Sequence, residues 1–288
     1  MANRRWLLPE AIEDVLPCDA SRIEALRRNL IDEFTRHGYE FVIPPMLEYV
    51  ESLLPGSGHD LDLRTFKLVD QLSGRTLGLR ADMTPQVARI DAHLLNRKGV
   101  TRLCYAGSIA HARTPVGSSA REELQLGAEI YGCASWEADF EAVSLLLQTL
   151  SVAGLNKVYL DLSHAGVLAG ILDGQSLEKG DIEALYSLLQ SKDRPRLAIW
   201  AKCLPTKSAE ALMALTELNG PCAKVLADAK KALPKHKLID EALAQLEKLA
   251  AATAALPNDV ELSIDLADLR GYQYHSGVMF AAYVDKLP

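Results

Sequence analysis

The order of strand-forming and helix-forming segments constrains the fold of this chain most. Segments with strand patterns come first, residues 177–255 are then rich in Ala, Leu, Lys and Glu with no clear strand pattern, and strand patterns return at residues 260–266 and 276–284. The strict strand–helix alternation that predicts a parallel sheet is missing. We therefore expect an α+β fold in which residues 1–176 and 256–288 form a largely antiparallel sheet flanked by helices, with a helical insertion at residues 177–255.

Apolar periodicity locates the first elements. Residues 21–38 place Ile, Leu and Phe at three- and four-residue steps, which predicts an amphipathic helix that ends at its final glycine. Residues 39–43 predict a short strand, because the two prolines that follow cannot donate to a ladder. Residues 65–80 predict a β-hairpin around a Ser-Gly turn, and Thr84 is expected to cap a helix whose first residue is Pro85.

The same reasoning locates the elements before the insertion. Strands are expected at residues 102–110 and 121–132, joined by a Gly-, Pro- and Ser-rich loop that is too long for a tight turn. Residues 135–154 predict a helix, residues 157–163 a buried strand, and residues 164–172 another helix. No repeat or low-complexity stretch interrupts this order.

The composition excludes several classes of protein. With 49% hydrophobic residues the chain is not disordered, and no window approaches the roughly 18 apolar residues of a membrane span. A net charge of −7 disfavours a general nucleic-acid binder. The five cysteines include no CxxC pair and predict reduced structural thiols, so we expect no metal site. The N-terminal residues lack a secretory hydrophobic region, so we expect a cytoplasmic location and no membrane partner. We also expect no cofactor. Dinucleotide, P-loop, GxSxG and HExxH motifs are missing.

Polar residues recur in three segments where an apolar strand would be simpler: Arg80–Gln86, Glu122–Gly132 and Leu269–Gly277. In the second segment Glu123, Gln125, Gly127 and Glu129 alternate with apolar residues, so they share one face of a strand. One interpretation is a half-exposed antiparallel strand. The other is the polar floor of a ligand site.

These segments resemble the ligand-binding motifs of histidyl-tRNA synthetase, a class II aminoacyl-tRNA synthetase, whose patterns run LRPEGT, RxFHQLGCEVFG and LVRGLDYY. The opening helix, strand and Pro44 resemble the class II motif that forms the dimer interface. The resemblance covers residues 9–165 and 258–288, with the insertion in the variable part. It implies a class II synthetase-like fold and self-association as a dimer.

The chain departs from the synthetases in the motif that binds ATP. Where their pattern FRHERP carries an Arg for the α-phosphate, this chain has His111, preceded by Ala110 and followed by Arg113 in the place of an acidic residue. His cannot form the bidentate fork of Arg and is mostly neutral at pH 7. We therefore expect that adenylate chemistry is lost. No third class II motif and no anticodon-binding domain follow Pro288, which suggests a truncated chain.

The patterns LRADMTPQVARI and LRGYQYHSGVMFAAYV are closer to the regulatory subunits of ATP phosphoribosyltransferase, the synthetase paralogues of histidine biosynthesis. This resemblance implies a noncatalytic subunit that works with a short-form catalytic subunit in a hetero-octamer of four subunits of each kind. It also implies feedback inhibition by free histidine and makes tRNA an improbable partner. Two alternatives stay open, a divergent histidyl-tRNA synthetase and a synthetase-like accessory protein without selectivity for free histidine.

The resemblance also implies a histidine site, to which it assigns Asp82, Thr84, Gln125, Glu129, Arg270, Tyr274 and His275. The first three would face the ammonium, Arg270 the carboxylate and Glu129 the imidazole NH, with Tyr274 lining the pocket. The alternatives are a helix cap for Asp82, a structural ion pair for Arg270 and simple packing for Tyr274. His275 could donate to the ligand, pair with Glu129 or face solvent. His111 is expected to be a vestigial residue of a Ser/Gly loop, with contact to an anion as the alternative.

Overall fold

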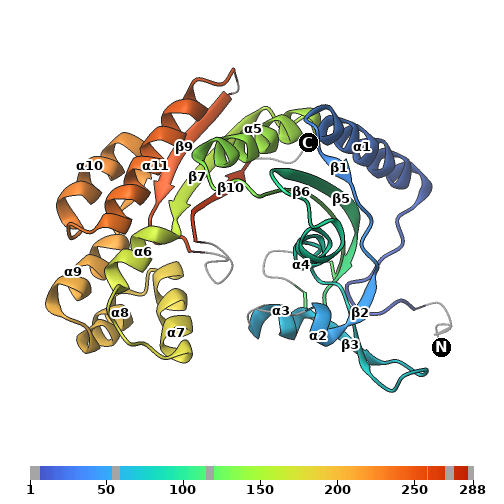
Figure 1. The fold of residues 1–288 in the computed structure, drawn as a ribbon, viewed down its shortest axis with the longest axis horizontal. Coiled ribbons are helices and arrows are strands. Elements are labelled where there is room, and N and C mark those ends of the chain that lie inside the picture. The colour runs from blue at the N-terminus through green and yellow to red at the C-terminus, as the bar shows by residue number, and fades with distance from the viewer. Residues whose placement is uncertain (1–6, 54–58, 115–119, 258, 270–275, 285–288) are drawn as a thin grey trace. The chain divides into compact units, whose positions relative to one another are not determined.

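A computed structural model describes residues 7–53, 59–114, 120–257, 259–269 and 276–284. The chain divides into two compact units, residues 1–134 and residues 135–288, which we describe one at a time. Figure 1 shows the order of the elements along the chain. Of the helices in the described ranges, none is long and apolar enough to cross a membrane.

The first unit contains one 20-residue helix, several short helices and two sheets. Its helices are α1 (Pro17–Arg36), α2 (Val50–Leu53), α3 (His59–Arg64), α4 (Thr84–Arg89) and the π-helix η2 (Ile90–Leu95). Its strands are β1 (Glu40–Phe41), β2 (Leu47–Tyr49), β3 (Phe66–Val69), β4 (Thr76–Leu79), β5 (Thr101–Ala110) and β6 (Glu122–Tyr131). They form the sheets β1-β5-β6 and β2-β4-β3.

The long antiparallel β5–β6 hairpin is the scaffold of this unit. Tyr105 pairs with Gly127 and Leu103 with Glu129 in its register. Leu103 and Tyr105 of β5 pack with Met83 and Val87, which are 1% and 0% exposed, so the start of α4 is anchored on the hairpin. In Figure 1 α4 lies beside the curved strands β5 and β6.

Several sequence expectations for the first unit hold, and two need correction. The 65–80 hairpin is confirmed as β3–β4, and the strands near residues 102–110 and 121–132 are confirmed as β5 and β6. The expected 39–43 strand is wrong in length, because only Glu40–Phe41 pairs, in parallel with β5, before the prolines end the ladder. Thr84 is not the cap of its helix: α4 begins at Thr84, and the cap position is Met83.

The second unit is built on one four-stranded sheet of order β10-β7-β9-β8. Its strands are β7 (Lys157–His164), β8 (Asn219–Pro221), β9 (Asp259–Asp265) and β10 (Val278–Tyr283). Its helices are α5 (Trp136–Val152), α6 (Ala165–Leu172), α7 (Lys179–Gln190), α8 (Arg194–Trp200), η3 (Ala201–Cys203), α9 (Thr206–Leu215), α10 (Cys222–Ala232) and α11 (Lys237–Ala254). The neighbouring strands β7 and β9 are parallel, and β8 and β10 are antiparallel to theirs.

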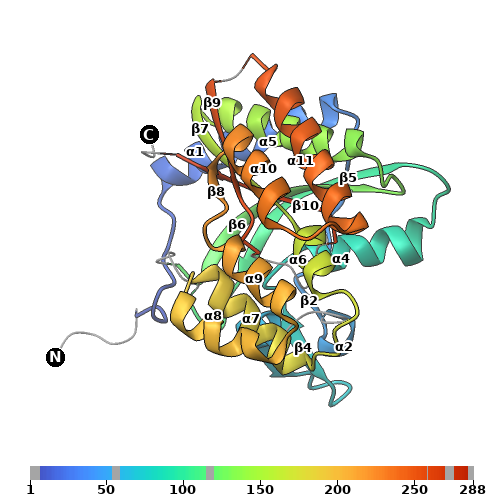
Figure 2. The same cartoon turned by 90° about the vertical axis from the view of Figure 1, so that its left-hand side faces the viewer.

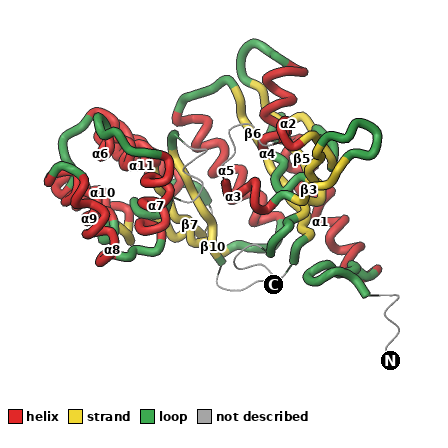
Figure 3. Tube along the Cα trace, turned by 90° about the horizontal axis from the view of Figure 1, so that it is seen from below, coloured by secondary structure: helices red, strands yellow, loops and turns green. Residues whose placement is uncertain are grey.

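The helices α6 to α11 pack with the sheet in one hydrophobic core. This core joins Leu160 and Ile264 of the strands to Leu212 and Leu246 of α9 and α11, all 0% exposed. Figure 2 shows α10 and α11 beside β9, with α7, α8 and α9 below them, and Figure 3 shows α6 to α11 gathered on one side of β7. The strand β8 corrects the expectation that residues 177–255 contain no strand. The assignment of that segment as a separate insertion stays a prediction.

The fold class is α+β, as the sequence indicated. In the described ranges, five of the seven strand pairs are antiparallel, and they are distributed over three sheets. Local periodicity identified the strands, whereas their division into sheets depends on long-range pairing that periodicity does not encode.

Candidate functional site

Four of the predicted histidine-site residues come together in the first unit. Asp82 lies two residues before α4 and Thr84 is its first residue, while Gln125 and Glu129 lie on β6. Because side chains alternate along a strand, Gln125, Gly127 and Glu129 share one face of β6. Hydrogen bonds between this face and the start of α4 join the two segments into one polar network.

The side-chain amide of Gln125 fixes the turn before α4. Its Oε1 accepts from the backbone N–H of Met83 at 2.9 Å, and its Nε2 donates to Asp82 Oδ1 at 2.9 Å. The same Asp82 oxygen accepts from the backbone N–H of Thr84 at 3.0 Å. Asp82 therefore supports the first turn of the helix and also presents a carboxylate to the network, so its structural and ligand-binding interpretations are compatible.

Tyr105 is a member of this network that the sequence analysis missed. Its hydroxyl donates to Glu129 Oε1 at 3.1 Å and lies 3.1 Å from Thr84 Oγ1. Since the tyrosine proton goes to Glu129, the Thr84 hydroxyl is the donor to the tyrosine oxygen. The hydroxyls thus form a chain from the start of α4 to the carboxylate on β6.

Gly127, which interrupts the polar residues on one face of β6, is the feature of the sequence that could have indicated Tyr105. Gly127 pairs directly with Tyr105, and a Cβ at Gly127 would lie 2.3 Å from the phenol oxygen. Any other residue at this position would clash with the buried ring. A glycine on the polar face of a strand therefore marks the place where a large side chain from the neighbouring strand crosses it.

Burial controls the protonation of Glu129. It raises the pKa of this carboxyl from 4.5 to about 7, the hydrogen bond from Tyr105 acts in the opposite direction, and the nearby charge of Asp82 raises the pKa further. Burial also raises the pKa values of Tyr105 and Tyr131, with the Glu129 charge adding to both. Near neutral pH the site thus holds a carboxyl group that a cation or an NH donor could convert to its ionised form.

Arg80 and Gln86 connect this network to the segment after β1. Arg80 is 6% exposed and donates to the carbonyls of Ser108 and Pro44 at 2.8 and 2.7 Å. Gln86 donates to the carbonyl of Pro45 at 2.8 Å. Burial lowers the pKa of Arg80. Both side chains hold backbone in place, so we assign them a structural role.

A polar pocket of about 420 Å³ adjoins the network. We call it the Asp82 pocket; its polar lining residues are Arg64, Asp82, His111, Glu123 and Gln125. His111 is only 3% exposed and forms a bridge with Thr65, which corrects the expectation that it belongs to the open loop. Arg113 is exposed, and it is Arg64 that brings a guanidinium to the lining.

Three predicted site residues, Arg270, Tyr274 and His275, lie outside the described residues. Their contribution stays a prediction. The four predicted residues that the structure does describe belong to one network, and Tyr105 is its fifth member.

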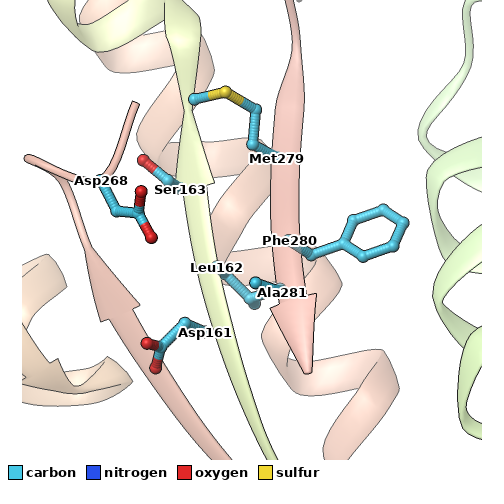
Figure 4. A pocket seen from close by; sticks show the side chains of 7 residues that line it. All are labelled: Asp161, Leu162, Ser163, Asp268, Met279, Phe280 and Ala281. Carbon is cyan, nitrogen blue, oxygen red and sulfur yellow. The ribbon is translucent and has the colours of Figure 1, made fainter. Parts of the chain in front are cut away.

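A second pocket, in the second unit, is too small for an amino acid. Its volume is about 40 Å³, close to the space that one water molecule needs. Figure 4 shows Asp161, Ser163 and Asp268 on one side of β7 and Phe280 directed to the other side. The buried Oγ of Ser163 has no hydrogen-bond partner in the described part of the chain, and Asp161 accepts a hydrogen bond from Ser263.

Within the described ranges, no group of three or more His, Cys, Asp and Glu residues could hold a metal ion. The five cysteines are free thiols, and burial raises the pKa of Cys104 to about 11 and also raises that of Cys222. Such thiols are poor nucleophiles at neutral pH. The polar network around Asp82 and Glu129 is therefore the candidate functional site.

The chain is similar to known proteins over almost all of its length. A family profile described as histidyl-tRNA synthetase matches residues 11–288. The ATP phosphoribosyltransferase regulatory subunit of Polynucleobacter necessarius subsp. necessarius (strain STIR1) is 76% identical over 284 residues, which are 99% of this chain and 73% of the relative. That of Paraburkholderia xenovorans (strain LB400) is 58% identical over 283 residues, 98% of this chain and 73% of the relative.

Solved structures share the fold. An ATP phosphoribosyltransferase regulatory subunit/histidyl-tRNA synthetase from Bacillus halodurans C matches with a TM-score of 0.83 and 27% identity, over 98% of this chain and 74% of that chain. The ATP phosphoribosyl transferase (HisG:HisZ) complex from Thermotoga maritima matches with a TM-score of 0.65 and 18% identity, over 91% of this chain and 87% of that chain. The second likeness shows the fold alone.

Proposed function

This chain belongs to the histidyl-tRNA synthetase family and, within it, to the regulatory subunits of ATP phosphoribosyltransferase, and we propose that it binds free histidine and transmits this signal to a catalytic partner. Family membership supports a role in histidine biosynthesis. The proposal has three parts: histidine is the effector, a short-form catalytic subunit is the partner, and this chain has no catalytic activity of its own.

The observation that carries the proposal is the partly buried Glu129 carboxyl in one hydrogen-bond network with Asp82. Histidine offers an ammonium, a carboxylate and an imidazole NH. The carboxylate of Asp82 and the amide of Gln125 fit the ammonium, and Glu129, whose pKa burial raises to about 7, fits the imidazole. A ligand NH that donates to Glu129 stabilises its ionised form, so binding relieves the unfavourable burial of that charge. Arg270, Tyr274 and His275 complete the proposed site.

The partner is proposed to be a short-form catalytic subunit, in an assembly of four subunits of each kind within the cytoplasm. If histidine binds here while catalysis occurs in the partner, inhibition must come from different histidine affinities of the active and inactive assemblies. The name of the Thermotoga maritima HisG:HisZ complex supports association with a second chain.

Self-association as a dimer is part of the same proposal. The apolar stripe of α1 is only half covered within its unit, because Leu30 and Phe34 are buried while Ile23 and Leu26 are 42% and 38% exposed. Ile43, after β1, is 79% exposed. A second copy that covers these side chains would remove apolar surface from water.

His111 supports a noncatalytic role. It is buried at the position where the synthetases have an arginine for the α-phosphate, and it lacks the planar fork that binds a phosphate through two hydrogen bonds. We expect no pyrophosphate exchange driven by ATP and histidine, and we expect that His111→Arg does not restore it. Exchange above a heat-inactivated control would favour the alternative of a divergent synthetase.

Reconstitution with a short-form ATP phosphoribosyltransferase catalytic subunit tests the proposal. Formation of phosphoribosyl-ATP is measured for the catalytic subunit alone and for the mixture, each with and without histidine. We expect this chain to increase the rate and to make it sensitive to histidine. Equal inhibition of the catalytic subunit alone would place the histidine site in the partner and overturn the proposal.

Thermal unfolding of the isolated chain tests histidine binding separately. A ligand that binds the folded state raises the melting temperature. L-histidine should raise it, whereas histidinol, which lacks the carboxylate, should have a much smaller effect. Equal shifts would remove carboxylate recognition from the proposed site, and no shift with either ligand would favour the accessory-protein alternative.

A further inference from the structure

The small pocket of the second unit lies where β9 separates from β7. The parallel pairing of these two strands ends at Leu162 and Ile264, whereas β7 continues to His164. The residue after Leu162 is Ser163, which still pairs with Met279 of β10 on its other side. The ladder with β9 therefore stops one residue before Ser163, and the pocket of about 40 Å³ is lined by Ser163 at this point.

The hydroxyl of Ser163 is buried at this pocket. Ser163 is 4% exposed, and its Oγ has no hydrogen-bond partner among the residues that the structure describes. Figure 4 shows its side chain on the same side of β7 as the carboxylates of Asp161 and Asp268, which also line the pocket. A buried hydroxyl without a partner is unfavourable, and an ordered water molecule commonly supplies the missing hydrogen bond. The hydroxyl therefore indicates a small polar ligand.

The two carboxylates of the pocket are held by their own segments. Asp161 pairs with Ser263 of β9 and accepts a hydrogen bond from the Ser263 hydroxyl. Asp268 follows β9 in a turn: its N–H donates to the Asp265 carbonyl at 3.2 Å, and the Asp265 carboxylate accepts from the N–H of Ala267 at 3.0 Å. A carboxylate has about four acceptor positions, so one that already has a partner can accept from a further donor.

We propose that this pocket binds one water molecule, which accepts from the Ser163 hydroxyl and donates to the carboxylates of Asp161 and Asp268. A water molecule donates through its hydrogens and accepts through its lone pairs, so it matches one hydroxyl and two carboxylates, and about three hydrogen bonds are typical of a buried water. The volume of about 40 Å³ admits water but no amino acid. Among the residues that the structure describes, no group of three or more His, Cys, Asp and Glu could hold a metal ion.

The water joins two segments beyond the end of their ladder. Ser163 directly precedes His164, whose side chain accepts from the N–H of Gly166 at 2.9 Å and caps α6. Asp268 belongs to the turn that follows β9. A water between Ser163 and Asp268 therefore connects the start of α6 to this turn by hydrogen bonds where the strands no longer do so.

A crystal structure of the full chain, at a resolution that shows ordered waters, tests the site directly. One water oxygen is expected at about 2.5–3.2 Å from Ser163 Oγ and from one carboxylate oxygen each of Asp161 and Asp268. A direct hydrogen bond from Ser163 to either carboxylate, or a pocket without electron density, would overturn the inference. A species at about 2.0–2.6 Å from these oxygens would be a metal ion and would overturn it as well.

Thermal unfolding of wild type, Ser163→Ala and Ser263→Ala tests the same hydroxyl in solution. Ser263 is the matched control, because it lies on the neighbouring strand and its hydroxyl has a protein partner, Asp161. If water satisfies the Ser163 hydroxyl, Ser163→Ala loses a hydrogen bond and should lower the melting temperature by about 2–4 °C, in the same direction as Ser263→Ala. If the hydroxyl has no partner, its removal is neutral or stabilising. A melting temperature of Ser163→Ala equal to or above that of wild type would therefore refute the water site.

Discussion

Replacement of Glu129 by glutamine should stabilise the protein without ligand and weaken its binding of histidine. The glutamine keeps the size of the side chain and can still accept from the Tyr105 hydroxyl, whose oxygen lies 3.1 Å from Glu129 Oε1. What it removes is the ionisable group. Since burial raises the pKa of Glu129 from 4.5 to about 7, the folded protein binds this proton more tightly than the unfolded chain does.

The direction of the pH dependence follows from this difference. Below about pH 4.5 both states hold the proton, and above about pH 7 both have lost it, so only the window between the two values matters. Within this window unfolding releases a proton, and the free energy of unfolding of the wild type therefore falls as the pH rises. The whole shift in pKa would lower the free energy of unfolding by about 3 kcal/mol across this window. We expect about 1–3 kcal/mol, because the carboxyl keeps some contact with solvent.

Urea unfolding at pH 5, 6, 7 and 8 gives the free energy of unfolding of the variant and of the wild type. The advantage of Glu129→Gln over the wild type should grow from pH 5 to pH 7 and stay constant above pH 7. Glu122→Gln, an exposed position on the same strand, should differ from wild type by less than about 0.5 kcal/mol at every pH. Saturating histidine should reverse the order of wild type and Glu129→Gln, because the variant should bind histidine about tenfold or more weakly.

Two results would refute this reasoning. A stability difference that does not change between pH 5 and pH 8 would show that Glu129 titrates normally and is not strained by burial. Loss of catalytic activation with unchanged histidine sensitivity in the reconstituted complex would place Glu129 at the subunit interface and not in the effector site.

Three further substitutions test the packing around the site. Gly127→Ala should destabilise by about 1–3 kcal/mol in urea unfolding, because its Cβ would lie 2.3 Å from Tyr105, whereas Gly180→Ala, with no atom within 4 Å, should be neutral or stabilising. Gln125→Leu removes both hydrogen bonds that fix the turn before α4 and should weaken histidine binding in calorimetry by about tenfold; unchanged affinity would count against the site. Leu160→Ala, at a 0% exposed position of β7, should lower the free energy of unfolding by about 2–5 kcal/mol without changing the histidine dissociation constant.

Local patterns in the sequence determined the strands of the first unit and four residues of the candidate site. The β3–β4 hairpin, the strands β5 and β6 and the polar face of β6 follow from the two-residue period of a strand, which each segment carries by itself. The motif resemblance then singled out Asp82, Thr84, Gln125 and Glu129, which the structure joins in one network.

Only the tertiary structure decided which distant residues meet. Tyr105 lies in an apolar-looking strand, and its place beside Glu129 depends on the register of β5 against β6. Arg64 reaches the Asp82 pocket because the end of α3 pairs with the end of β5, a contact between segments with no shared pattern in the sequence. The raised pKa of Glu129 has the same origin, since burial is a property of the packed fold and not of the residue. A sequence therefore specifies which groups are present, and packing determines their partners and their charge.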